Sequence, residues 1–91
     1  MRFKITRHSG FAVPNGALEQ LLQQLGPRRE RIAFAKVGGE IWATLEVDAP
    51  VSMTHDERAD VGRHTVLNLV REVCDGAAEL RSDWFAVSSE R

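Results

Sequence analysis

The densest group of residues able to do chemistry lies between positions 55 and 64, and it comprises His55, Asp56, Glu57, Asp60 and His64. Asp60 and His64 are four residues apart, so on a helix they share one face, and Asp56 lies one turn earlier on it. A divalent metal ion could take Asp56, Asp60 and His64 as ligands. The same residue types are candidates for general acid–base catalysis.

Ordinary structural roles explain this group better. Carboxylates in a first helical turn are favoured by the helix dipole, and an Asp–His pair four residues apart is a common surface contact. No Ser-His-Asp or Cys-His arrangement can be derived from spacing alone. We therefore assign no catalytic residue, metal ligand or cofactor, and whether the protein is an enzyme stays open.

A long helix is expected to carry this group. Thr54 followed by Glu57 is the pattern of a capping box, so the helix should begin there. Apolar residues at helical spacing continue to Asp75, and Gly76 is the expected C-cap. The predicted length is about five to six turns.

A β-hairpin is predicted over residues 31–48, where two alternating runs flank Gly38-Gly39. A two-residue turn fixes the register, so Val37 should face Glu40 and Arg31 should face Glu46 as a cross-strand ion pair. The core face should carry Ile32, Phe34, Ile41, Ala43, Leu45 and Val47. The other face should carry Arg31, Ala33, Ala35, Val37, Glu40, Trp42, Thr44 and Glu46.

The remaining elements follow from similar patterns. Residues 2–6 alternate as a half-buried strand, and a last strand is expected from Leu80 or Ser82 to Ser88. A first helix should follow Asn15 as N-cap, with a leucine stripe ending before Gly26. Residues 28–31 are interpreted as a solvated basic loop, with a phosphate contact as the alternative.

The order strand, helix, strand, strand, helix, strand predicts a single α+β domain over residues 1–91, the ferredoxin-like plait. Its antiparallel sheet should have four strands in the order fourth, first, third, second, with two helices on one face. Many unrelated functions share this superfold. The sequence has neither the Cys-x-x-Cys of metallochaperones nor the aromatic signature of RNA-recognition modules.

The sheet face without helices is the predicted binding surface. Alternation places Lys4 outward on the first strand, between Trp42 on the third strand and Trp84 on the fourth, with Ala35 and Thr44 beside Trp42. Exposed apolar patches usually mark interfaces, and twofold dimers are the commonest oligomers. We therefore expect a homodimer that packs these faces together. A protein partner or a small ligand is the alternative, and coverage of the indoles by Lys4 would leave the face without a function.

Two further alternatives concern other ligands. A cavity between sheet and helices, lined by Phe11–Pro14 and Trp42 and approached by His8, would make the protein a small-ligand enzyme or carrier. Nucleic acid is an unlikely partner because the net charge is −1. A local cluster of basic residues nevertheless precedes Gly39 and could bind a single strand with Trp42; it comprises Arg2, Lys4, Arg7, Arg28, Arg29, Arg31 and Lys36.

Composition favours an ordinary folded domain, with 43% hydrophobic and 27% charged residues. No apolar run reaches the roughly 20 residues that span a bilayer, and the first residues lack the apolar region of a signal peptide. The one cysteine, Cys74, excludes an intrachain disulfide and falls within the apolar helical pattern, so a buried and inert thiol is expected. We expect a cytoplasmic protein without membrane contact.

Overall fold

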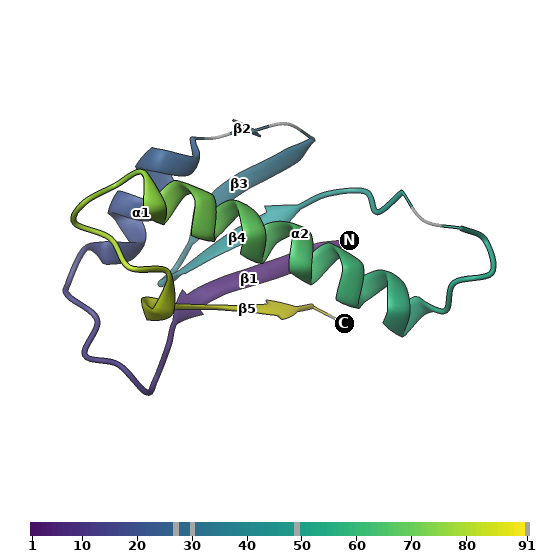
Figure 1. The fold of residues 1–91 in the computed structure, drawn as a ribbon, viewed down its shortest axis with the longest axis horizontal. Helices are drawn as coiled ribbons and strands as arrows, with labels where there is room; N and C mark the ends of the chain where they lie inside the picture. Colours follow the sequence, from purple (N-terminus) through teal and green to yellow (C-terminus); the bar gives the residue numbers. More distant parts are fainter. Residues whose placement is uncertain (27, 30, 49, 91) are drawn as a thin grey trace.

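The computed structural model describes residues 1–26, 28–29, 31–48 and 50–90. Figure 1 shows one sheet with two helices lying across it. The elements in chain order are β1 (Arg2–Arg7), α1 (Ala17–Leu25), β2 (Arg28–Arg29), β3 (Ile32–Val37), β4 (Glu40–Thr44), α2 (His55–Asp75), a 3-10 helix η1 (Ser82–Trp84) and β5 (Phe85–Ser89). The predicted α+β class is confirmed.

The β3–β4 hairpin forms in the predicted register. Val37 faces Glu40, Ala35 faces Trp42 and Ala33 faces Thr44. Gly38 has a φ of 63°. This is the left-handed conformation that the tight turn requires and that glycine adopts without strain. Because side chains alternate along a strand, this register fixes which residues enter the core.

All strands pair antiparallel in one sheet, in the order β2-β3-β4-β1-β5. The predicted four-stranded sheet is therefore extended by β2, whose two residues pair with Ala33 and Ile32 at the edge. The expectation of a loop at Arg28 and Arg29 was wrong, because their backbone pairs with the start of β3. β1 lies between β4 and β5 near the middle of the sheet.

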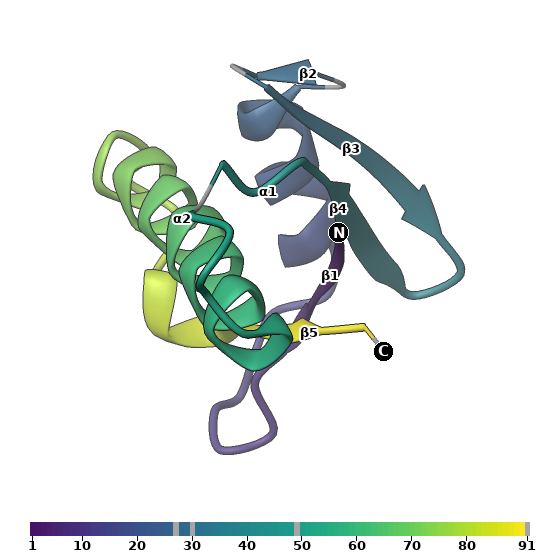
Figure 2. The same ribbon diagram turned by 90° about the vertical axis from the view of Figure 1, so that its right-hand side faces the viewer.

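Both helices lie on the same side of the sheet (Figure 2). They pack on the face that the hairpin pattern predicted to be the core face. Its buried strand residues are Phe3, Ile5, Ile32, Phe34, Ile41, Ala43, Phe85 and Val87, and the helices add Leu18, Leu21, Leu25, Val66, Leu69, Val70 and Val73. At about 25 cal/mol per Å² of apolar surface, this burial is the main stabilising contribution to the fold.

The helix ends agree with the predictions except at one cap. Thr54 Oγ1 accepts from the Glu57 amide and Glu57 Oε1 accepts from the Thr54 amide, both at 3.2 Å, so the capping box is confirmed. Gly76 and Gly26 are the C-caps, as expected. Asn15 is not the N-cap of α1, because Gly16 occupies that position in a left-handed conformation and no side chain caps the helix.

Gly62 of α2 lies against Phe3 of β1 and Val47. A Cβ at this position would lie 2.4 Å from Phe3 Cζ and 2.9 Å from Val47 Cγ2. Real Cβ atoms do not approach so closely, and the Phe3 ring is fully buried. The absence of a side chain at Gly62 therefore sets the distance between α2 and β1.

Lys36 links the hairpin to α1 through an ion pair with Glu19. A hydrogen bond from Lys36, together with its charge, lowers the pKa of the Glu19 carboxyl below its usual 4.5. The contribution of this contact to stability is present above that value and is lost as pH falls through the lowered pKa.

Within the described residues, no helix is long and apolar enough to cross a membrane.

Candidate functional site

Trp42 lies on the helix-free face, as predicted, but two basic side chains cover its ring. Register places Lys4 beside Trp42 and Arg2 beside Thr44. The Arg2 guanidinium carbon lies 4.3 Å from the centroid of the Trp42 ring, and Lys4 Nζ lies 5.2 Å from it. Both distances are within the range of cation–π attraction. The indole is consequently half-buried rather than fully open.

Lys4 also holds two carboxylates near this ring. Its Nζ lies 3.9 Å from Glu40 Oε2 and 3.7 Å from Glu90 Oε2. Ala35 and Thr44 are exposed at the sides of Trp42. The middle of the helix-free face is therefore covered by charged side chains. The apolar part of this face is a strip on β3 that comprises Ala35 and Val37.

Trp84 does not belong to this surface, which corrects the prediction. It lies in η1, before β5 begins, and its side chain packs against the hydrophobic core. Lys4 faces Ser88 on β5, not Trp84. Phe85, the residue that follows Trp84, pairs with Arg7 of β1. Arg7 is three residues from Lys4, a separation of about 10 Å in an extended strand. The two tryptophans therefore do not form one patch.

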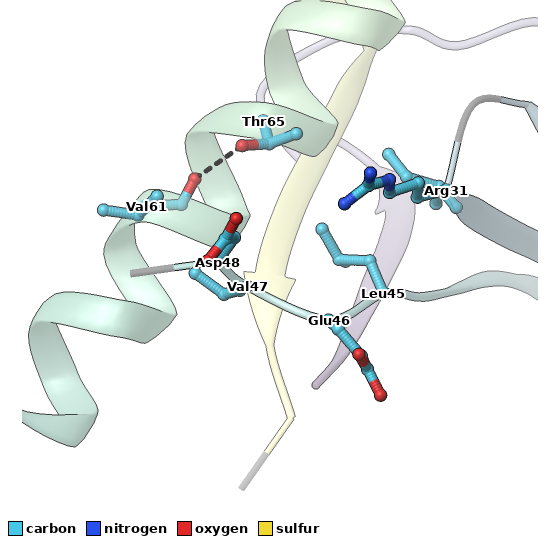
Figure 3. Close-up of a pocket in the computed structure, with 8 residues that line it drawn as sticks. Arg31, Leu45, Glu46, Val47, Asp48, Val61 and Thr65 are labelled. Carbon is cyan, nitrogen blue, oxygen red and sulfur yellow. Dashed lines mark hydrogen bonds between the residues drawn. The ribbon is translucent and has the colours of Figure 1, made fainter. Parts of the chain in front are cut away.

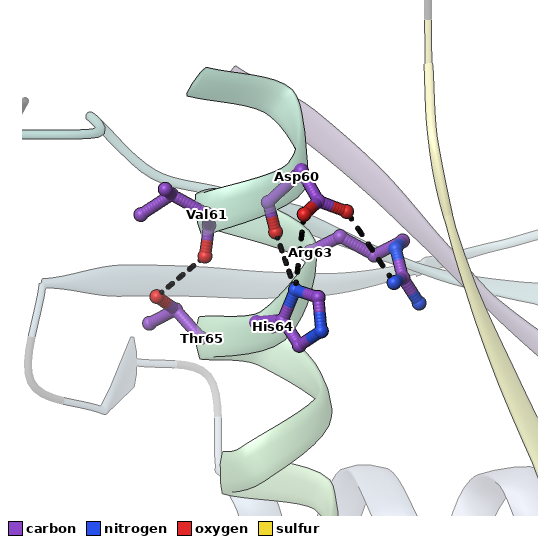
Figure 4. Close-up of polar contacts among 5 residues, drawn as sticks. All are labelled: Asp60, Val61, Arg63, His64 and Thr65. Carbon is purple, nitrogen blue, oxygen red and sulfur yellow. Dashed lines mark hydrogen bonds and ion pairs between the residues drawn. The ribbon is translucent and has the colours of Figure 1, made fainter. Parts of the chain in front are cut away.

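Asp60 and His64, two of the three candidate metal ligands, make contacts within α2 (Figure 4). His64 Nδ1 lies 2.9 Å from the Asp60 carbonyl oxygen and 3.7 Å from Asp60 Oδ2. Arg63 Nη2 lies 3.5 Å from Asp60 Oδ1. Over the described ranges, no group of three histidine, cysteine or acidic side chains could hold a metal ion. The suggested metal site at Asp56, Asp60 and His64 is therefore not supported.

Within the described residues, His8 contacts Phe11, and neither lines the pocket between the sheet and α2. The His8 ring packs edge-on against Phe11 with centroids 5.2 Å apart, and His8 Nδ1 accepts a hydrogen bond from the Gly10 amide at 3.0 Å. Both residues are exposed. The segment forms a surface turn beyond the end of β1.

The basic residues of the N-terminal half are divided among different parts of the structure. Arg2 and Lys4 lie over Trp42. Arg7 lines a hollow with Lys36, which pairs with Glu19. Arg31 lines a pocket on the helix side. The side chains of Arg28 and Arg29 lie outside the described part of the structure. The described basic residues therefore provide no continuous track for a phosphate backbone.

A pocket of about 360 Å³ does lie between the sheet and α2, away from the predicted lining. It arises because the two helices differ in length, with 9 residues in α1 and 21 residues in α2. At a rise of about 1.5 Å per residue, α1 spans about 14 Å and α2 spans about 32 Å. Figure 1 shows α1 beside the C-terminal half of α2 only. The start of β3 and the segment after β4 consequently face α2 with no second helix over them.

The pocket combines an apolar floor with charged ends. Its eight lining residues are Arg31, Ile32, Leu45, Glu46, Val47, Asp48, Val61 and Thr65. Figure 3 shows Arg31 on one side, Asp48 on the other near α2, and Leu45 between them. A smaller hollow of about 230 Å³ shares Ile32 and Thr65 and continues along α2 to Glu72.

The predicted Arg31–Glu46 ion pair is absent from the ion pairs of the described residues. β4 ends at Thr44, so the pairing does not extend to position 46. Figure 3 shows the Glu46 carboxylate directed away from Arg31 and the Arg31 guanidinium directed toward α2. Arg31 is therefore available to a ligand in the pocket.

Backbone contacts hold the walls of this pocket in place. The Leu45 amide donates to the Met1 carbonyl at 2.9 Å, which fixes the segment after β4 against the first strand. Arg58 Nη2 donates to the Pro50 carbonyl at 3.1 Å, tying the connection to the start of α2. The pocket is thus formed before any ligand binds.

Cys74 is buried at 4% exposure. Burial raises the pKa of its thiol, with a further increase from neighbouring Asp75. Since the thiolate is the reactive form, the expected inert role is supported.

Searches against protein-family models, curated protein sequences and solved structures found no match to this chain.

Proposed function

We propose that this protein is a small-ligand-binding module whose site is the pocket between α2 and the β3–β4 side of the sheet. The observation that carries the proposal is the pocket itself, at about 360 Å³. Small-molecule sites usually occupy about 300–1,000 Å³ and combine apolar walls with a few polar groups. Ile32, Leu45 and Val61 supply the walls here, and Arg31 and Asp48 supply the polar groups.

The size of the pocket indicates the size of the ligand. Each molecule of liquid water occupies about 30 Å³. The pocket volume therefore corresponds to about a dozen water molecules. A ligand of comparable size is a small organic molecule rather than a dinucleotide or a folded partner. No reaction is assigned, because the Thr65 hydroxyl in the lining donates to the Val61 carbonyl at 2.9 Å rather than to a base.

Filling the pocket from α2 tests this proposal. Val61 is 40% exposed and lines the pocket, so Val61→Trp should place an indole in it without disturbing the core. We expect hexanol, an uncharged probe, to shift the amide resonances of Leu45 and its neighbours. The Kd should be in the millimolar range, which corresponds to a binding free energy of about −4 kcal/mol. The shifts should disappear in Val61→Trp.

The matched control is Arg71→Trp, which adds the same ring to an exposed position of α2 outside the pocket. This variant should bind hexanol as the original protein does. Shifts confined to other regions, or equal binding by both tryptophan variants, would contradict a site in this pocket.

Self-association through the helix-free face is a second candidate function. The observation in its favour is the apolar strip on β3, where Ala35 is exposed and Val37 is 60% exposed beside Trp42. Arg2 and Lys4 over the indole weigh against a dry interface. We expect any dimer to be weak and centred on this strip.

Light scattering from micromolar to millimolar protein tests self-association. A dimer would have about twice the monomer mass of 10.2 kDa. Ala35→Glu should return it to a monomer, because like charges would meet across a twofold axis. Gln23→Glu adds the same charge on exposed α1 and should leave the dimer intact. A monomer at every concentration would eliminate this candidate.

The proposed fold family is a variant of the ferredoxin-like plait. In support, the chain order becomes strand, helix, strand, strand, helix, strand when β2 is set aside. The edge strand β2 is the departure from a four-stranded plait. This assignment implies no function, because the superfold hosts many.

A further inference from the structure

We propose that the pocket takes a small zwitterion, with a carboxylate at one end and an ammonium at the other, joined by an apolar chain. This inference rests on the proposed ligand-binding function and names its ligand class. Aminocaproate is the simplest representative. The inference depends on the kind and placement of the charges that line the pocket.

Arg31 lies at one end of the pocket (Figure 3). Its guanidinium lines the pocket, and no ion pair joins it to another residue of the described ranges. Glu46, the nearest carboxylate expected by register, is directed away from it (Figure 3). A guanidinium binds carboxylates through two parallel hydrogen bonds. One end of the pocket is therefore suited to a carboxylate.

Asp48 provides the opposite charge. It lines the opposite side of the pocket, near Val47 and α2 (Figure 3). No ion pair engages it within the part of the chain that the structure describes. This end is suited to an ammonium group.

The floor of the pocket between the two charges is apolar. Leu45 lies between Arg31 and Asp48 (Figure 3), and Val47, Ile32 and Val61 complete the apolar lining. An alkyl chain would cover this floor, whereas a purely charged ligand would leave it in contact with water. A ligand with only one charged end would leave either Arg31 or Asp48 without a partner.

A comparison of four probes of similar size tests the charges separately from the pocket. Aminocaproate carries both charges, caproate only the negative one, hexylamine only the positive one, and hexanol neither. Amide shifts at the pocket should give aminocaproate a Kd about fivefold lower than that of caproate or hexylamine, the scale expected for an exposed ion pair.

Two variants assign each preference to its residue. Arg31→Gln should bind aminocaproate and hexylamine equally, and Asp48→Asn should bind aminocaproate and caproate equally. Arg71→Gln and Asp75→Asn remove the same charges from exposed positions outside the pocket and should keep the original preferences. Unchanged resonances elsewhere would show that each variant folds.

The outcomes separate the two proposals. If hexanol binds in the pocket as tightly as aminocaproate, or if the two charge variants change nothing, the zwitterion inference is wrong and the ligand-binding function stands. If none of the four probes shifts the pocket amides, both proposals fail.

Discussion

Replacing Gly62 with alanine should lower the free energy of unfolding by about 1–2 kcal/mol, although alanine is the better helix former. Overpacking a filled core costs about 1–3 kcal/mol, and so close a contact corresponds to the upper part of that range, about 2–3 kcal/mol. The helix propensity gained, about 1 kcal/mol, offsets part of this cost. The added Cβ would lie 2.4 Å from the buried Phe3 ring, so either α2 or the ring must move. Urea denaturation measures the difference.

Gly76→Ala is the matched control for this substitution. Gly76 follows the same helix with a φ of −86°, and an added Cβ would be 3.7 Å from the nearest atom, an ordinary contact. This variant should be neutral or slightly stabilising. Phe3→Leu combined with Gly62→Ala should recover part of the loss from Gly62→Ala. A Gly62→Ala protein as stable as the original would mean that α2 does not pack on Phe3 as described.

Replacing Ile41 with alanine should be more costly, about 2–5 kcal/mol. Its side chain is fully buried in the middle of the sheet, facing Ile5 across the β1–β4 pair. The loss combines the transfer of apolar surface with the cavity left behind. Thermal and urea unfolding should both show the change, and a two-state transition should persist.

Val37→Ala is the matched control on the same hairpin. Val37 lies on the outer face at 60% exposure. Its truncation should therefore change stability by no more than about 0.5 kcal/mol. Equal losses at Ile41 and Val37 would contradict the assignment of faces that the hairpin register implies.

The sequence was most informative where a local rule acts alone. A two-residue glycine turn permits one register, so the pairing of Val37 with Glu40 and the buried positions of Ile41 and Ala43 could be predicted. The capping box at Thr54 also depends only on residues three apart, and it was confirmed.

Predictions failed where tertiary contacts override local pattern. Trp84 was expected on a strand because it alternates with Phe85 and Val87, yet the chain turns through η1 and the indole packs on the core. β2 has two residues, too few for any periodic signal. Arg31 was expected to pair with Glu46, but β4 ends before the pairing reaches them.

The pocket could have been inferred from the lengths of the helices. The leucine pattern of α1 ends at Gly26 after few turns, whereas the pattern of α2 continues from Thr54 to Asp75. Such a difference leaves part of the sheet with one covering helix. Which side chains line the gap depends on where the segment after Thr44 runs, and its backbone bonds to Met1 give no signal in the sequence.

The position of β1 has a consequence for how the chain folds during synthesis. β1 is made before β4 and β5, yet these two strands are its partners, and Phe3 pairs with Ser89, far along the chain. Until β5 emerges, one edge of β1 has no partner within the described chain. The sheet can therefore close only after β5 is made, in a cooperative step that brings distant segments together and is typically slower than local folding.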